Sequence, residues 1–133
     1  MSGRQVKTSR SVLISGASLA GPTLAYWLDR YGFDVTVVER APAVRSGGYP
    51  IDVRGTAIDV VERMGLLPKV RAAHIAARSL TFVDAAGRTV GEMPVYDLAA
   101  NQADHDVELP RGVLTTLLYD LTRGRGIRYR FDD

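Results

Sequence analysis

One short run of small residues in the chain is suited to binding phosphate. The run Gly16–Gly21, with the sequence GASLAG, follows an apolar segment and precedes a segment with apolar residues at helical spacing. It has the outline of the dinucleotide fingerprint G-x-G-x-x-G, with a serine at the second glycine. The first glycine permits a tight turn, a small second residue lets backbone approach a pyrophosphate, and the third glycine lets the helix pack close to its sheet. We therefore expect phosphate contacts from Gly16, Ala17, Ser18, Leu19, Ala20 and Gly21 at the positive end of this helix.

An acidic residue lies where such a site needs one. Glu39 ends a second apolar segment, Asp34–Glu39, about 20 residues after the glycine-rich run, where an acid accepts hydrogen bonds from ribose hydroxyls. It also disfavours NADP, because its charge would repel the 2′-phosphate. The plainer interpretation is a small-residue turn that binds nothing, followed by a solvated acid. The order of strand, turn, helix and strand favours the binding site.

A βαβ unit is predicted to position these residues. Ser11–Ser15 and Asp34–Glu39 are predicted as parallel strands, and the helix between them begins at Pro22 and closes at Gly32. Downstream, the pattern predicts a loop over 41–49, a strand over 51–53 and helices over 56–64 and 66–77. A hairpin of strands 80–83 and 89–93 follows, and then an irregular segment over 96–106. The last predicted elements are a helix over 112–123 and a strand over 127–131. The apolar residues expected in the core are Trp27, Tyr31, Val113, Leu114, Leu117, Leu118 and Leu121.

Composition excludes several classes of function. The chain has 133 residues, 46% hydrophobic and 24% charged, which suits one globular domain. A net charge of +2, with basic residues spread along the chain, does not indicate nucleic-acid binding. The absence of cysteine excludes disulfides, thiolate metal sites and cysteine nucleophiles. No apolar run is long enough for a signal peptide or membrane span, so we expect a cytoplasmic protein that binds no metal.

The segment 12–42, VLISGASLAGPTLAYWLDRYGFDVTVVERAP, resembles the opening of the FAD-dependent aromatic hydroxylases, the para-hydroxybenzoate hydroxylase-like monooxygenases. The resemblance implies that Glu39 binds the adenosine ribose and that Arg40 lies beside the adenine or phosphates. Residues 46–53, SGGYPIDV, resemble the family's loop near the flavin ring, and 109–114, LPRGVL, resemble its arginine at a helix start. The further cofactor contacts implied are Arg45 (with FAD or the nicotinamide cofactor), Asp52 and Arg54 on the flavin side, and Arg111 near the ribityl or phosphate part of FAD.

The implied fold class is α/β, a partial Rossmann-like FAD-binding domain with an added β-hairpin, incomplete at its C-terminus. Residues 1–10 are expected to be a flexible N-terminus, and 11–133 the N-terminal part of that domain. Members of the family use FAD, NAD(P)H and O₂ to hydroxylate an organic substrate. Here the substrate is expected to be aromatic or polyketide-like. The flavin performs the chemistry, so no catalytic residue is assigned.

The resemblance covers only the first third of a usual member. The family's later Asp-Gly and Gly-Asp motifs are absent, and the predicted strand 127–131 is expected to pair with a strand beyond Asp133. The chain alone is therefore expected to be inactive and to need its missing C-terminal part or a second chain. Two alternatives stay open: an NAD- or FAD-dependent oxidoreductase of another class, and a truncated, non-catalytic nucleotide-binding module. A plain Rossmann dehydrogenase would carry a third βα repeat in place of the hairpin.

Overall fold

The computed structural model describes residues 10–75, 79–94 and 106–133. The chain divides into two compact units, which are described separately: one holds the described residues up to 48 together with 111–133, and the other lies within 49–110. The first unit contains β1 (Ser11–Ser15), α1 (Ala20–Arg30), β2 (Asp34–Glu39), α4 (Arg111–Arg123) and β7 (Arg128–Phe131). The second contains β3 (Pro50–Val53), α2 (Thr56–Arg63), α3 (Leu67–Ala72), β4 (Ser79–Val83), β5 (Thr89–Pro94) and β6 (Val107–Pro110).

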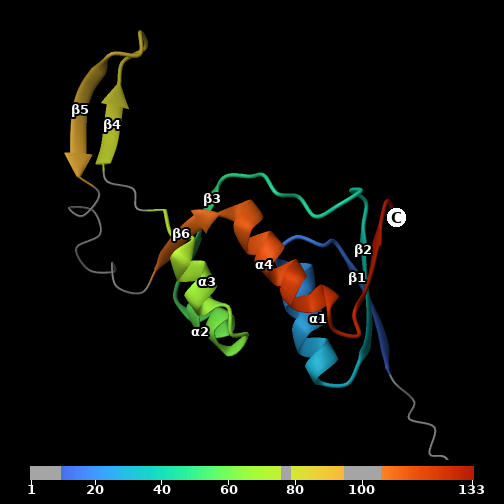
Figure 1. Ribbon diagram of the computed structural model, residues 1–133. Helices are drawn as coiled ribbons and strands as arrows, with labels where there is room; N and C mark the ends of the chain where they lie inside the picture. The colour runs from blue at the N-terminus through green and yellow to red at the C-terminus, as the bar shows by residue number, and fades with distance from the viewer. Residues whose placement is uncertain (1–9, 76–78, 95–105) are drawn as a thin grey trace, which may run out of the picture. The chain divides into compact units, whose positions relative to one another are not determined.

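The first unit is built on a three-stranded parallel sheet in the order β1-β2-β7 (Figure 1). The predicted parallel pairing of the first two strands is confirmed, with Ser11 opposite Asp34 and Ser15 opposite Val38. The pairing of the last strand with β2 was not predicted, and the expected partner beyond Asp133 stays a prediction. Strand β7 pairs with β2, because the α4 crossover returns the chain to the sheet in the parallel direction. The expected α/β class is confirmed, and the described elements mix parallel and antiparallel sheets with four helices.

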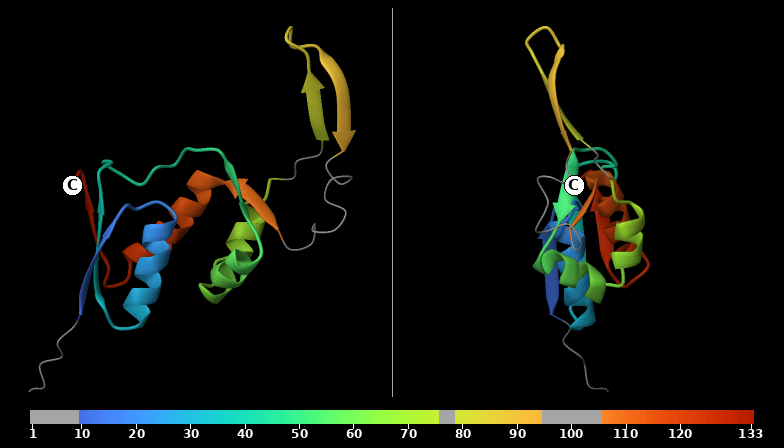
Figure 2. Two further views of the ribbon diagram at one scale, coloured as in Figure 1. Left: turned by 180° about the vertical axis from the view of Figure 1, so that it is seen from behind. Right: turned by 90° about the vertical axis from the view of Figure 1, so that its left-hand side faces the viewer.

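Helices α1 and α4 cover one face of this sheet, as the front and back views show (Figures 1 and 2). Alternation along the strands explains which side chains they bury: Ile14, Val35 and Val37 lie in the core, with Ala25 of α1 and Ile127 before β7 packed among them. Burial of these side chains removes apolar surface from water and holds the strand ends that carry the glycine-rich turn.

The opposite face of the sheet is largely polar. It presents Thr36 of β2 and Arg128 of β7, whose Nε donates a hydrogen bond to the threonine hydroxyl at 3.2 Å. Arg128 also pairs with Asp34 at 2.9 Å. Leu13 is an apolar exception on this face, 69% exposed. A shallow hollow on this face is lined by Ser11, Val12, Leu13, Thr36, Val38, Arg130 and Asp133.

Helix α1 ends as the sequence predicts. Gly32 adopts φ +81°, and its amide donates to the Asp29 carbonyl at 3.0 Å, which closes the last turn. Its start lies two residues earlier than predicted, at Ala20, which leaves Pro22 in the first turn. Two predictions of core residues were wrong: Tyr31 is 75% exposed and Val113 of α4 is 38% exposed.

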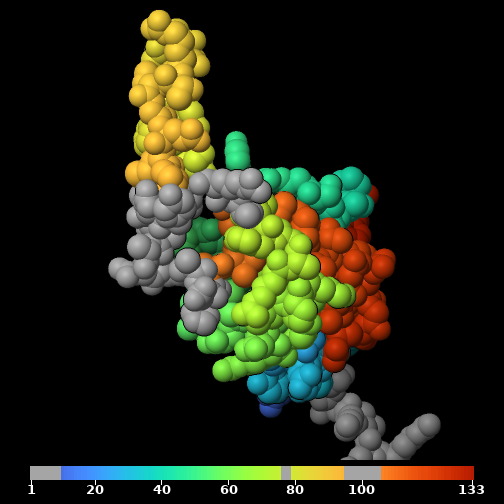
Figure 3. Space-filling view, turned by 60° about the vertical axis from the view of Figure 1, so that its left-hand side comes forward, coloured from blue at the N-terminus to red at the C-terminus, as the bar shows by residue number. Residues whose placement is uncertain are grey.

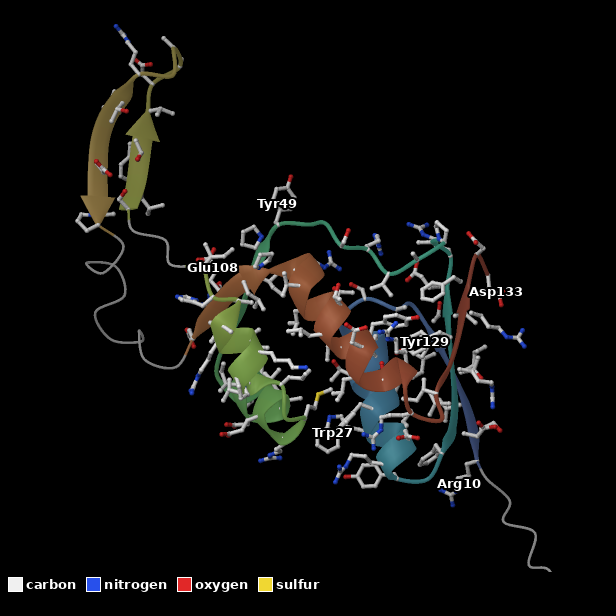
Figure 4. All side chains as sticks on the ribbon, viewed as in Figure 1. Arg10, Trp27, Tyr49, Glu108, Tyr129 and Asp133 are labelled. Carbon is white, nitrogen blue, oxygen red and sulfur yellow. The ribbon has the colours of Figure 1, made fainter. Side chains whose placement is uncertain are left out.

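Aromatic packing joins α4 to β7. Tyr129 points from its strand toward the helix (Figure 4), and its ring lies edge-on to Tyr119 at 4.9 Å between centroids. Its hydroxyl lies 2.7 Å from the hydroxyl of buried Thr122. Burial raises the pKa of Tyr129 above its ordinary value, so this phenol stays neutral and keeps its hydrogen bond at physiological pH. These contacts hold β7 against α4.

The second unit contains an antiparallel β3–β6 pair and helices α2 and α3, whose outer surfaces appear in green in Figure 3. Strands β4 and β5 form the predicted antiparallel hairpin around the turn at Asp84–Gly87. Helix α3 is shorter than the predicted 66–77, and residues 76 and 77 lie outside the described residues. The predicted irregular segment also lies outside them, except for Asp106.

Candidate functional site

The glycine-rich turn joins the end of β1 to the start of α1. Gly16 has φ +102°, a conformation open to glycine, and its amide donates to the Val38 carbonyl of β2 at 2.7 Å. A Cβ at Gly21 would overlap the carbonyl oxygen of Gly16, so only glycine allows this approach of helix to turn. The two glycines therefore shape a turn that is tight and bonded to the neighbouring strand.

The first turn of α1 keeps its amide donors open to an anion. Leu19 at the N-cap offers no side-chain acceptor, and the first turn carries no acidic residue. The initial N–H groups of a helix have no partner within the helix, and the helix dipole makes this end positive. An incoming phosphate would find donors here that no side chain of α1 already occupies.

Glu39 connects the turn to the loop after β2. One oxygen of its buried carboxylate, Oε2, accepts the Ala17 amide at 2.8 Å, and the other, Oε1, accepts the Ala41 amide at 3.0 Å. The amide of Ala17, then that of Ala41, lowers the pKa of Glu39 below its ordinary value of 4.5, with smaller help from the charges of Arg45 and Arg40. Each carboxylate oxygen has two lone pairs, so one on each remains for a further donor.

Arg111 reaches the same turn from the start of α4. Its Nη2 donates to the Ser18 hydroxyl at 3.0 Å, although the two residues are 93 positions apart in the chain. Its aliphatic stem lies against Gly48, where an added Cβ would stand 3.3 Å from Cδ of the arginine. Next to it, Gly112 leaves room for the Ser46 carbonyl, which a Cβ would overlap. The carboxyl ends of β1 and β2, the loop 46–48 and the start of α4 thus bring together the glycine-rich turn, Glu39 and Arg111.

Comparison with known proteins gives a consistent assignment, although no protein-family model matches the chain. An uncharacterized protein of Mycobacterium tuberculosis is 43% identical over 125 residues, which are 93% of this chain and 33% of that protein. Flavin-dependent monooxygenase eupH of Phoma sp is 42% identical over 128 residues, 94% of this chain and 30% of its own. The solved structure of tetracycline destructase Tet(51) has a TM-score of 0.78 and 32% identity over 93% of this chain and 30% of its own.

By sequence and by fold, the chain is similar to flavin-dependent monooxygenases. It corresponds to their N-terminal part and spans about a third of the length of the curated relatives it matches. The predicted resemblance is thereby confirmed at the level of the family. The role of each candidate residue within that family stays a prediction.

The remaining charged candidates, three arginines and one aspartate, lie in two places. Arg40 and Arg45 are exposed, and their charges reach Glu39 at the end of β2. Asp52 and Arg54 belong to the second unit, where they form an ion pair with each other. The Arg54 guanidinium also lies 3.9 Å from the Asp106 carboxylate. The first pair adds positive charge near the turn, whereas the second pair is occupied within its own unit.

Two residues that shape the surroundings of the site escaped prediction: Ser46 and Gly112. A glycine near a helix start carries a weak local signal, and the need for it comes from a carbonyl in a distant loop. The Nδ1 of His74 lies 3.1 Å from the Glu108 carbonyl, and His105 lies outside the described residues.

The described residues show no cluster of three His, Cys, Asp or Glu side chains able to hold a metal ion. None of the helices found within the same ranges is both long and apolar enough to cross a bilayer.

Glu39→Gln is expected to lower the free energy of unfolding by about 1–2 kcal/mol at pH 7, because an amide NH₂ cannot accept one of the two backbone bonds. The folded-state pKa of Glu39 lies below 4.5, so its contribution to stability is fully present above that pH and is lost as the pH falls through the folded-state pKa. Urea unfolding from pH 7 to 3 measures this. An identical pH dependence in wild type and variant would contradict it.

Proposed function

We propose that this chain is the FAD-binding segment of a flavin-dependent monooxygenase. The observation that carries the proposal is the meeting of three groups in the first unit: the open amide donors in the first turn of α1, the Glu39 carboxylate and the Arg111 guanidinium. The similarity to flavin-dependent and FAD-dependent monooxygenases supports the choice of FAD among the ligands that such a site accepts. The β1-β2-β7 order also agrees with half of a dinucleotide-binding sheet.

The residues present fit the ADP part of FAD. In the Gly16–Gly21 turn, the small residue Ser18 stands where the fingerprint lets backbone approach the pyrophosphate, and Gly21 lets the start of α1 pack against the turn. The first-turn amides of α1 would donate to the phosphate oxygens. Glu39 would accept a ribose hydroxyl on a lone pair that its two backbone bonds leave free. Arg111 would bring a positive charge to a phosphate or to the ribityl chain.

When bound, FAD supplies the redox chemistry with NAD(P)H and O₂, and the substrate we propose is an aromatic or polyketide-like compound. The residues of this chain bind and orient the cofactor, which is why none of them is assigned a proton transfer. Arg40 and Arg45 would add attraction for phosphate near the turn. Asp52 and Arg54 would serve the flavin side from the second unit. The remainder of the protein would complete the substrate site and hold FAD from its other side.

Calorimetric titration of the full-length protein with ADP, adenosine, FAD and NAD tests the proposal. We expect binding of ADP and FAD and weaker binding of adenosine, because the turn and the α1 donors act on the pyrophosphate. A preference for NAD over FAD would favour an oxidoreductase of another class. A folded, colourless protein without affinity for ADP would favour a non-catalytic module, and either result would overturn the assignment.

A further inference from the structure

We infer that the Ser18 hydroxyl positions the Arg111 guanidinium for a pyrophosphate. This inference deepens the proposed function and rests on it. It gives a role to the one residue at which the turn departs from the glycine fingerprint. In that role, the hydroxyl acts on the ligand through the arginine.

Two neighbours, Ser18 and Gly48, contact the Arg111 side chain. Its tip donates to Ser18 Oγ at 3.0 Å, and its stem lies along Gly48, which has φ +132° and no Cβ to push the stem away. The adjacent Gly112 lets the loop carbonyl of Ser46 approach the start of α4. Loop, helix start and turn therefore direct one guanidinium to the place where the α1 donors lie.

The chemistry of the contact preserves the charge of the arginine. Arg111 takes part in none of the ion pairs found among the described residues. A carboxylate partner would neutralise the guanidinium and compete with phosphate, whereas a neutral hydroxyl accepts one N–H and leaves the others free. Arg111 is exposed and its side chain has many rotamers, so an anchor lowers the entropy lost when a phosphate binds.

A double-mutant cycle on the full-length protein tests the inference, with ADP and adenosine as probes in a calorimetric titration. Ser18→Ala is expected to weaken ADP binding about fivefold, and Arg111→Ala about tenfold or more, as expected for hydrogen bonds to a charged group. Adenosine affinity should stay within about twofold, because it lacks the pyrophosphate that the arginine contacts. In the Arg111→Ala background, Ser18→Ala should have no further effect.

Ser18→Gly provides a sharper comparison, because it restores the second glycine of the fingerprint. The fingerprint alone predicts unchanged or tighter ADP binding, whereas positioning through the hydroxyl predicts weaker binding. Thr116→Ala is the matched control, since it also removes an exposed hydroxyl, one bonded to the Gly112 carbonyl within α4. Circular dichroism checks that each variant folds. Where Ser18→Ala does not, the isosteric pair Ser18→Thr and Ser18→Val replaces it, and only the valine should weaken ADP binding.

The outcomes separate the two claims. Folded wild-type protein that does not bind ADP overturns the proposed function, and this inference with it. Wild-type protein that binds ADP, with Ser18→Ala equally harmful in both backgrounds, overturns the inference alone, because the hydroxyl then acts on phosphate directly. An unchanged ADP affinity in Ser18→Ala also overturns it.

Discussion

Gly21→Ala is expected to lower the free energy of unfolding by about 3 kcal/mol, the upper part of the usual cost of overpacking, and to abolish measurable ADP binding. The new Cβ would overlap the carbonyl oxygen of Gly16. Gly16 cannot retreat cheaply, because its amide is bonded to the Val38 carbonyl at 2.7 Å. The helix start would have to move away from the turn, and its free amide donors would move with it. Urea unfolding followed by circular dichroism and an ADP titration measure the two effects.

Gly124→Ala is the matched control for this prediction. Gly124 is exposed, follows α4, and has open space where its Cβ would stand. Its substitution should change the free energy of unfolding by about 0.5 kcal/mol or less, as is usual for surface positions. Equal losses at the two glycines would show that the close approach of α1 to the turn contributes nothing special to stability.

Gly112→Ala is expected to lower the free energy of unfolding by about 2 kcal/mol, within the usual range for overpacking, and to weaken ADP binding. Its Cβ would overlap the carbonyl of Ser46. Ser46 lies in a loop rather than a strand, so the loop can shift, and the loss of stability should be smaller than at Gly21. A shifted loop would remove the surface at Gly48 along which the Arg111 stem lies.

Hydrogen exchange in residues 44–48 and an ADP titration measure the effect at Gly112. Faster exchange confined to this loop, together with weaker ADP binding, is the expected result. Gly47→Ala is the control within the same loop, because a Cβ there would meet open space. If the two variants exchange alike, the contact between Ser46 and Gly112 does not hold the loop.

The features that the sequence predicted correctly are those with a local signal. Gly32 closes α1, and the Asp84–Gly87 turn joins the hairpin, because each conformation depends on residues only a few positions apart. The glycine-rich turn, Glu39 and Arg111 could likewise be selected as candidates from their positions at predicted strand and helix ends. What they bind remains a proposal.

The errors arise where distant residues or helix geometry decide the outcome. Tyr31 has helical spacing from Trp27, but it is the C-cap residue of α1, and the chain turns away at Gly32. Val113 lies about 100° around α4 from Leu114, on the side opposite to the buried Thr115, Leu118 and Thr122, so it faces away from the core. The partner of β7 was missed because it lies far away in the sequence. Arg128 of β7 stands opposite Thr36 of β2, 92 positions earlier in the chain. Nothing in either strand alone encodes that choice.

The sheet order has a consequence for synthesis of the chain. Strand β2 lies between β1 and β7, but the second unit of the chain separates β2 from β7 in sequence. During translation, β1, α1 and β2 emerge first, and the outer edge of β2 stays unpaired until Arg128–Phe131 leave the ribosome. Unpaired strand edges recruit other strands, and contacts between distant residues form late. The protein is therefore most prone to aggregate or to bind chaperones during translation, before β7 has been synthesised and paired with β2.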